Sequence, residues 1–196
     1  NNIVNNLFAS LGLIYLQTNR AKTAMKFFNK ELMINPLNTV ALNNLGIINL
    51  NLKNYIIAKN YFYQALKISS NAKTLYFLGL ILTELEDFDK AIKFYKKSIR
   101  MEKNADASCN IGNLYYFLGS LDNAKKNTLD AIKINPRHDT AYNNLGLINM
   151  AFGNLKDAKR NFLDAIKYNP NNTKAYWNVS KLINYRDDNK QFQKLL

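Results

Sequence analysis

The sequence predicts an all-α protein, a solenoid made of copies of one helix–turn–helix unit. Five glycines recur at spacings of 34, 33, 33 and 34 residues: Gly12, Gly46, Gly79, Gly112 and Gly146. An alanine follows each of them by twelve residues: Ala24, Ala58, Ala91, Ala124 and Ala158. No segment has the alternating pattern of a β-strand. A fixed period of this size indicates one supersecondary unit copied along an array rather than a globular catalytic domain.

Each copy predicts two amphipathic helices, because apolar residues recur at helical spacing, as at Leu42 and Leu45. The glycine and the alanine have almost no side chain, so the two helices can approach closely. An aromatic residue on the second helix is expected to fill the gap beside them: Phe28, Phe62, Tyr95 and Phe162. Proline then breaks the chain before the next unit in three copies: Pro36, Pro136 and Pro170.

Two positions depart from this pattern. Thr128 replaces the aromatic residue in the fourth copy, and Glu31 stands in the first copy where the others have alanine or serine. We expect the packing around both residues to be looser than in the other copies.

The recurring glycine, alanine, aromatic, small residue and proline resemble the tetratricopeptide repeat (TPR). The resemblance covers residues 5 to about 186, and it implies a right-handed superhelical α-solenoid whose first helices line a concave groove. The predicted repeats span residues 5–38, 39–71, 72–104, 105–138 and 139–172. A capping helix at 173–186 follows, and then a tail, or the start of a following domain, at 187–196.

The resemblance implies a non-catalytic scaffold that binds a protein or peptide segment in the groove. Asparagine recurs two residues before the recurring glycine, or before Ser180 in the last copy: Asn44, Asn110, Asn144 and Asn178, with Asn113 close by. Its side chain carries both a donor and an acceptor, so such a ladder can bind the main chain of an extended peptide. The alternative is that these asparagines only reflect a chain that is rich in asparagine throughout.

Aromatic residues on the first helices are candidate anchors for a bound segment: Tyr76, Phe77, Tyr116 and Trp177. The alternative is that some of them only pack against neighbouring helices. A carboxylate clamp of the TPR type is not expected. Asn113, Asn144 and Lys174 match it, but Cys109 and Asn178 stand where two of its cations belong.

The net charge of +13 and the pI near 9.7 raise the question of an acidic partner. Most lysines and arginines fall on the second helices, which form the convex side of the implied fold, so we expect a solvated basic face. The alternative is a convex surface that binds an acidic partner or a membrane surface. Nucleic acid is not expected, because the predicted groove carries few cations.

The sequence contains no arrangement of residues typical of a catalytic or metal site. We therefore expect no enzyme activity, no cofactor and no metal site. Cys109 is the one cysteine of the chain, and His138 is the one histidine. We expect His138 to lie in a solvated loop. No stretch is apolar for long enough to span a membrane. The single cysteine fits a reducing compartment, and we expect a cytoplasmic location. The chain begins at Asn1, so we expect a processed or partial chain that has lost any targeting segment.

Two further hypotheses concern the ends of the array. The segment from Tyr185 to Leu196 resembles the junction in bacterial proteins where TPR repeats precede a sulfotransferase-type domain. The chain is then the substrate-recruiting N-terminal region of a larger bacterial enzyme of sulfotransferase or glycosyltransferase type. The exposed ends of the solenoid are also candidates for self-association.

Overall fold

The computed structural model describes residues 6–182, which form eleven α-helices and no β-strand. The predicted all-α class is confirmed for this part of the chain. The structure contains two compact units, Asn1–Glu102 and Lys103–Leu196. Residues 183–186 of the predicted capping helix and the predicted tail at 187–196 lie outside the described residues, and the repeat boundaries remain a prediction.

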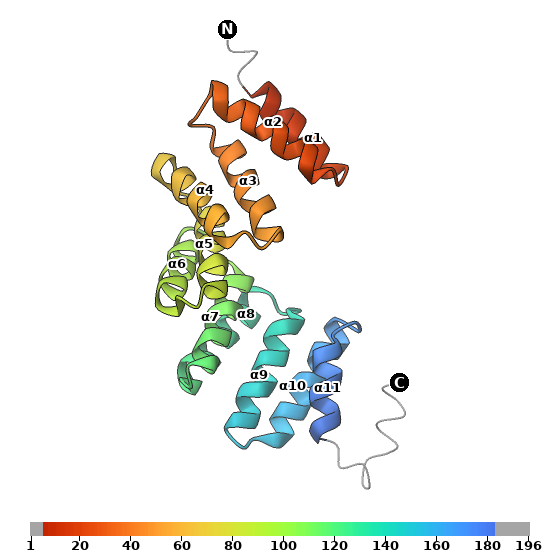
Figure 1. The fold of residues 1–196 in the computed structure, drawn as a ribbon. Helices are drawn as coiled ribbons and strands as arrows, with labels where there is room; N and C mark the ends of the chain where they lie inside the picture. Colours follow the sequence, from red (N-terminus) through yellow and green to blue (C-terminus); the bar gives the residue numbers. More distant parts are fainter. Residues whose placement is uncertain (1–5, 183–196) are drawn as a thin grey trace. The chain divides into compact units, whose positions relative to one another are not determined.

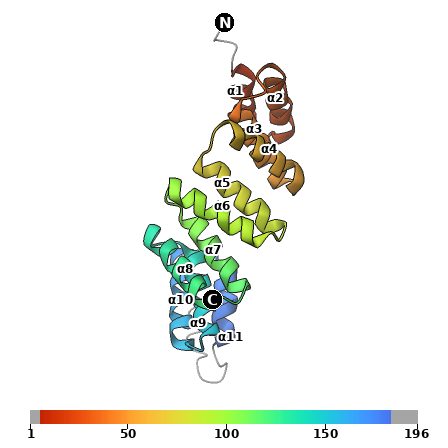
Figure 2. The ribbon, with the colours of Figure 1, turned by 90° about the vertical axis from the view of Figure 1, so that its left-hand side faces the viewer.

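The first unit contains three helix pairs, in which each helix packs against the one that follows it (Figure 1). The helices are α1 (Leu7–Gln17), α2 (Ala21–Ile34), α3 (Thr39–Asn51), α4 (Tyr55–Ile68), α5 (Ala72–Glu84) and α6 (Phe88–Met101). Figure 2 shows the same helices from the side.

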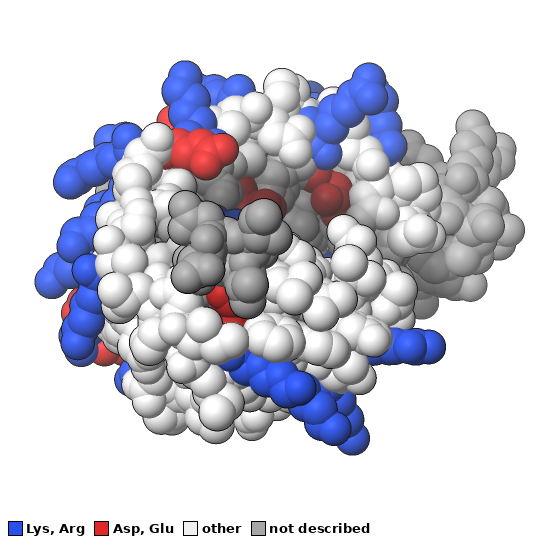
Figure 3. Space-filling view, turned by 90° about the horizontal axis from the view of Figure 1, so that it is seen from above, with Lys and Arg blue, Asp and Glu red and all other residues white. Residues whose placement is uncertain are grey.

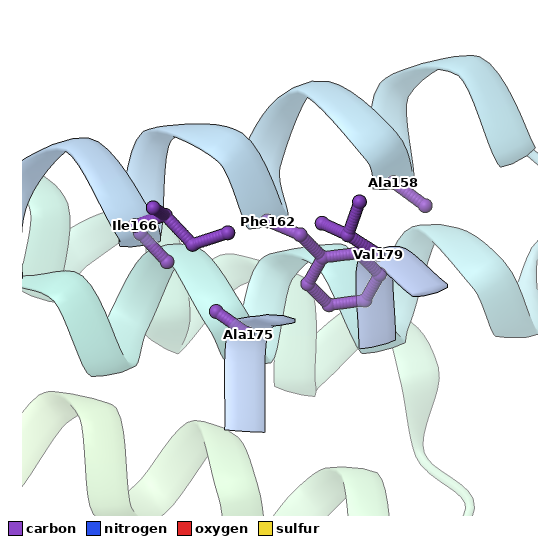
Figure 4. Packing of buried hydrophobic residues seen from close by; sticks show 6 residues of the cluster. Ala158, Phe162, Ile166, Ala175 and Val179 are labelled. Atoms are coloured by element: carbon purple, nitrogen blue, oxygen red, sulfur yellow. The ribbon is translucent and has the colours of Figure 1, made fainter. Parts of the chain in front are cut away.

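The second unit contains two helix pairs and a single last helix. Its helices are α7 (Ala105–Phe117), α8 (Leu121–Ile134), α9 (Asp139–Ala151), α10 (Leu155–Tyr168) and α11 (Thr173–Leu182). Helix α11 packs against α10, where Ala175 and Val179 cover the ring of Phe162 and the side chain of Ile166 (Figure 4). The apolar face of the last pair is therefore covered by α11.

The recurring glycine lies against the recurring aromatic ring. Phe28, Phe62, Tyr95 and Phe162 are all fully buried. A methyl group added to Gly46 would lie 2.8 Å from the ring of Phe62, closer than van der Waals contact allows. The absence of a side chain at this position is what lets a first helix pack directly on the ring of its partner helix.

The tight turn between the first and second helix of each pair holds one residue in the left-handed conformation. These residues are Asn19, Lys53, Glu86, Gly119 and Gly153, with φ between 58° and 77°. They fall seven residues after the recurring glycine in every copy. Glycine and asparagine adopt this conformation readily, whereas Lys53 and Glu86 adopt it at some cost in strain.

A side-chain cap begins each first helix after the opening one. Asn38, Asn71, Asn104 and Asn172 accept a hydrogen bond from the backbone N–H three residues ahead, at 2.8–3.0 Å. His138 takes the same place at the start of α9, where its Nδ1 accepts the N–H of Ala141 at 3.2 Å. Such caps satisfy backbone donors that the helix itself leaves unpaired.

The prediction that His138 lies in a solvated loop is wrong, since only 9% of the residue is exposed. Because Nδ1 accepts a hydrogen bond, Nε2 carries the proton and donates to Asp106 Oδ1 at 3.0 Å. Asp106 lies on α7, so the imidazole joins two first helices of the second unit. That partner is 32 residues away in sequence, which is why a local reading missed it.

Packing around Thr128 and Glu31 is not looser, contrary to the expectation. Thr128 is fully buried, and a methyl group added to Gly112 would lie 3.1 Å from its backbone nitrogen. The smaller side chain of Thr128 is thus accompanied by a close approach of the α8 backbone to Gly112 on α7. Glu31 is 2% exposed and accepts hydrogen bonds from the backbone N–H groups of Asn6 and Ala9 and from the Asn38 amide. Its carboxylate caps α1 from the neighbouring helix.

The cap at His138 leads to a test of stability. We expect His138→Asn to change the free energy of unfolding of the second unit by less than about 0.5 kcal/mol, because asparagine caps the other first helices. His138→Ala removes the acceptor and should cost about 1 kcal/mol. Urea denaturation followed by circular dichroism measures both. Equal stability of the alanine variant and the wild type would show that the cap contributes nothing.

Thr128 offers a second test, because its buried Oγ1 has no hydrogen-bond partner in the described part of the chain. Thr128→Val replaces an unpaired hydroxyl with a methyl group and should raise the free energy of unfolding by about 1 kcal/mol. Thr74→Val is the matched control, because the buried Thr74 hydroxyl lies 2.8 Å from Asn43 Oδ1. That change should lower stability by about 1 kcal/mol. A destabilised Thr128→Val variant would contradict this assignment.

Candidate functional site: the polar groove of the second unit

The first helices of the second unit border an open hollow of about 380 Å³ whose lining residues are all of polar types. The lining residues are Asn110, Asn113, Asp139, Thr140, Asn143, Asn144, Asn169, Asn171, Asn172, Thr173 and Lys174. They come from α7, α9, α11 and the turn before α11. Pockets for small molecules are mostly lined by apolar side chains. This hollow therefore suits a ligand that presents hydrogen-bonding groups along its length.

Helical spacing places the asparagines of the hollow on one face. Asn110 and Asn113 are three residues apart on α7, so they project from the same side of that helix. Asn144 extends from the adjacent first helix, α9, and its Nδ2 lies 3.4 Å from Cys109 Sγ. Contact with the thiol restricts the Asn144 side chain, and a restricted side chain loses less entropy when a ligand binds.

The turn before α11 contributes to the lining of the hollow and holds the half-buried acid Asp139 in place. Asp139 Oδ2 accepts hydrogen bonds from Asn169 Nδ2 at 3.0 Å and from Asn172 Nδ2 at 2.8 Å. Asn169 also accepts the backbone N–H of Asn171, which shapes the turn around Pro170. Lys174 supplies the cation of the hollow. The lining therefore includes one negative and one positive side chain beside the neutral asparagines.

The structure brings four of the predicted groove residues together in this hollow: Asn110, Asn113, Asn144 and Lys174. Asn178 lies beside it but is only 8% exposed, and its Nδ2 donates to Asn143 Oδ1 at 3.0 Å. Tyr116 is half-buried on α7. Trp177 is exposed on α11, where Lys181 Nζ lies 5.0 Å from its ring centre. None of these three residues lines the hollow.

The other predicted groove residues belong to the first unit. Asn44 donates to the carbonyl of Val40 in its own helix at 2.8 Å. Phe77 stacks on the buried ring of Phe62, with ring centres 5.3 Å apart, and it packs against the core of α4 and α5. Tyr76 contacts both Phe77 and Tyr95. The two aromatic residues thus take part in helix packing whatever else they contact.

The lining residues of the turn were not predicted from the sequence. Asn169, Asn171 and Asn172 line the hollow together with Asp139 at the start of α9, yet none of the four was a candidate. A signal was present, because Asn-Pro-Asn-Asn before a helix is a pattern of capped turns. In the folded chain, the polar groups of this turn contact Asp139 at the start of α9, the first helix of the preceding pair. Only the stacking shows that they meet the asparagines of α7 and α9.

Cys109 lies behind Asn144 and is 2% exposed. Burial, together with the negative charges of Asp106 and Asp139, raises the pKa of its thiol from 9.0 to about 12, although the Asn144 hydrogen bond acts in the opposite direction. The thiol is therefore neutral at physiological pH and acts as a small packing residue with a weak acceptor.

Among residues 6–182, no group of three or more His, Cys, Asp or Glu side chains is placed to hold a metal ion. None of the helices in that range combines the length and the apolar character needed to cross a bilayer.

The paired helices, with a glycine facing an aromatic ring in nearly every pair, define a helical-repeat protein. A sequence profile described as tetratricopeptide repeat matches residues 38–104, and a second with the same description matches residues 6–36, 105–138 and 139–172. The chain belongs to the tetratricopeptide repeat family, as its sequence pattern predicted. Repeats of this family typically form non-catalytic scaffolds that bind protein or peptide partners.

Known proteins are similar to this chain in sequence over a short stretch or in fold. The ycf37 protein of Pyropia yezoensis is 35% identical over 74 residues, which are 38% of this chain and 42% of that protein. The chain thus matches less than half the length of that relative. YrrB, described as a TPR protein with an unusual peptide-binding site, is 22% identical with a TM-score of 0.73 and coverage of 90% of this chain and 91% of its own.

Two other solved structures have the same fold. A MamA protein is 22% identical with a TM-score of 0.74, and the match covers 87% of this chain and 94% of that chain. PilF of Pseudomonas aeruginosa is 17% identical with a TM-score of 0.84, and the match covers 97% of this chain and 88% of that chain. At these identities the likeness is one of fold.

The burial of Cys109 has a measurable consequence. Because its pKa is about 12, we expect iodoacetamide to label native protein at pH 8 about a thousandfold more slowly than urea-unfolded protein. The unfolded thiol loses its proton first, so the contribution of Cys109 to stability should be constant below pH 9 and fall between pH 9 and 12. Mass spectrometry over time measures the labelling. Comparable rates in the two states would contradict a buried, neutral thiol.

Proposed function

We propose that this chain is a protein-interaction scaffold that holds the main chain of an extended peptide in the polar hollow of the second unit. The observation that carries the proposal is the convergence of Asn110, Asn113 and Asn144 on one hollow without an apolar lining residue. Each asparagine offers an NH₂ donor and a carbonyl acceptor, the same pair that a peptide bond requires.

The polar lining also bears on selectivity. Apolar pockets select particular side chains, whereas hydrogen bonds to the main chain are available in every peptide. Binding in the hollow should therefore depend weakly on peptide sequence. Peptide binding by YrrB, a protein of the same fold, supports this use of the repeat.

Aromatic residues near the hollow supply the remaining contact in this proposal. Trp177 is 63% exposed on α11, and Tyr116 on α7 is half-buried. Exposed aromatic rings of this kind are common anchors at protein interfaces. In the first unit, Asn44, Tyr76 and Phe77 form a separate candidate contact that this proposal does not require.

The proposal is tested with unstructured peptides selected from a random display library on the wild-type protein. We expect Asn110→Ala/Asn144→Ala to weaken their binding about thirtyfold, since two hydrogen bonds contribute about 1 kcal/mol each. Asn123→Ala/Asn127→Ala is the matched control on α8, away from the hollow, and should change affinity less than about twofold. Isothermal titration calorimetry gives the affinities, and thermal melting checks that the variants remain folded.

The salt dependence of binding distinguishes a site in the hollow from a site on the basic surface of the protein. Binding through neutral asparagines should change little between low and high salt, because only exposed charges are strongly screened. Unchanged affinity in the Asn110→Ala/Asn144→Ala variant would exclude the hollow as the site. If both variants retain binding and high salt abolishes it, the binding site would instead be assigned to the lysines.

A further inference from the structure

Helix α6 of the first unit carries a dense group of cations around a second hollow. The hollow has a volume of about 400 Å³ and is lined by Lys90, Lys93, Phe94, Lys96, Lys97 and Arg100. The buried residues of α6 are Ala91, Ile92, Tyr95 and Ser98, so its cations occupy the solvent side of the helix. Lys and Arg are also far more visible than Asp and Glu on the surface in Figure 3.

The hollow has an aromatic floor. Phe94 is half-buried, and its ring meets the edge of Tyr63 from α4 at 6.0 Å between ring centres. Lys97 Nζ lies 5.7 Å from the centre of the Phe94 ring, within the range of a cation–π contact. A small apolar surface is therefore enclosed by positive charges, which is a different chemistry from the polar hollow of the second unit.

The charges of this surface are only partly balanced. Lys90 forms an ion pair with Asp87 at 2.7 Å, and that contact lowers the pKa of Asp87 and raises the pKa of Lys90. No ion pair in the described part of the chain includes Lys93, Lys97 or Arg100. Like charges three and four residues apart repel on a helix, so an anionic partner relieves repulsion that the free protein retains.

We propose that this surface, Lys93, Phe94, Lys97 and Arg100, binds an acidic peptide segment that carries one apolar side chain. The carboxylates lie against the three cations, and the apolar side chain enters the hollow over Phe94. Two features favour a peptide over other polyanions. A lipid surface lies across a hollow rather than filling it. A nucleic acid base needs a whole open ring face for stacking, and Lys97 and Tyr63 already contact the Phe94 ring. An aliphatic side chain needs only the part of the ring that lines the hollow.

The test uses a labelled peptide of glutamates with one central leucine, and a second peptide in which serine replaces that leucine. Fluorescence anisotropy measures binding to the wild type and to two variants that each remove three charges. Lys93→Gln/Lys97→Gln/Arg100→Gln alters the proposed surface, and Lys126→Gln/Lys133→Gln/Lys156→Gln alters exposed lysines of the second unit. Oligodeoxythymidine and phosphatidylserine vesicles serve as competing anions.

We expect the leucine peptide to bind the α6 variant about tenfold more weakly than the wild type, and the second-unit variant within about twofold. The serine peptide should bind the wild type about fivefold more weakly than the leucine peptide, because it leaves the hollow unfilled. Asn110→Ala/Asn144→Ala should leave both affinities unchanged, which separates this surface from the groove.

Three results would overturn the proposal. Equal losses in the two charge variants would mean that only net charge matters. Equal affinity for the leucine and serine peptides would remove the hollow from the site. Tighter binding of the DNA or the vesicles, lost in the α6 variant, would assign the surface to another anion. Circular dichroism checks folding, and Lys93→Gln/Arg100→Gln replaces the triple variant if that variant loses helix.

Discussion

The close contact between a glycine on one helix and an aromatic ring on the next is the constraint on which the rest of each unit depends. A methyl group at Gly79 would lie 2.6 Å from the ring of Tyr95, so this position accepts no side chain without displacement of the ring. The contact fixes how deeply one helix packs on its partner. The glycine recurs at a nearly constant interval, and in the α7–α8 pair it packs on Thr128 instead of a ring, so each first helix presents the same face at the same register within its unit.

The ends of the helices are fixed by hydrogen bonds that have the same period. Each tight turn contains a left-handed residue, and the first helices after the opening one begin at a side-chain cap. These devices set where a helix starts, and hence which residues face the groove. The asparagines of α7 and α9 reach one hollow because both helices begin at the same point relative to their glycines.

The all-α fold could be predicted from the sequence, because glycine and alanine spacing reports directly on helix packing. The groove was predictable in part. Asn110 and Asn144 occupy the same place in two copies of the repeat, Asn113 and Lys174 match places of the TPR carboxylate clamp, and all four line one hollow. The roles of His138 and Glu31 could not be predicted. His138 bonds Asp106, and Glu31 bonds the backbone of Ala9. Such partners, 22 to 32 residues away, leave no local pattern.

The two candidate surfaces differ in chemistry. The hollow of the second unit offers neutral donors and acceptors, whereas the α6 surface offers positive charge around an aromatic floor. Hydrogen bonds to a main chain and contacts to acidic side chains use different parts of a peptide. The two surfaces bind either one partner that has both an acidic stretch and an extended stretch, or two separate partners.

The most direct test of the central claim is nuclear magnetic resonance of ¹⁵N-labelled protein titrated with a peptide that binds it. The side-chain NH₂ groups of asparagine give separate signals, so the groups that meet the ligand are observed individually. We predict that the signals of Asn110, Asn113 and Asn144 shift on binding while those of Asn123 and Asn127 on α8 remain in place. Shifts confined to residues outside the hollow, with these three signals unchanged, would contradict main-chain capture by the asparagine groove.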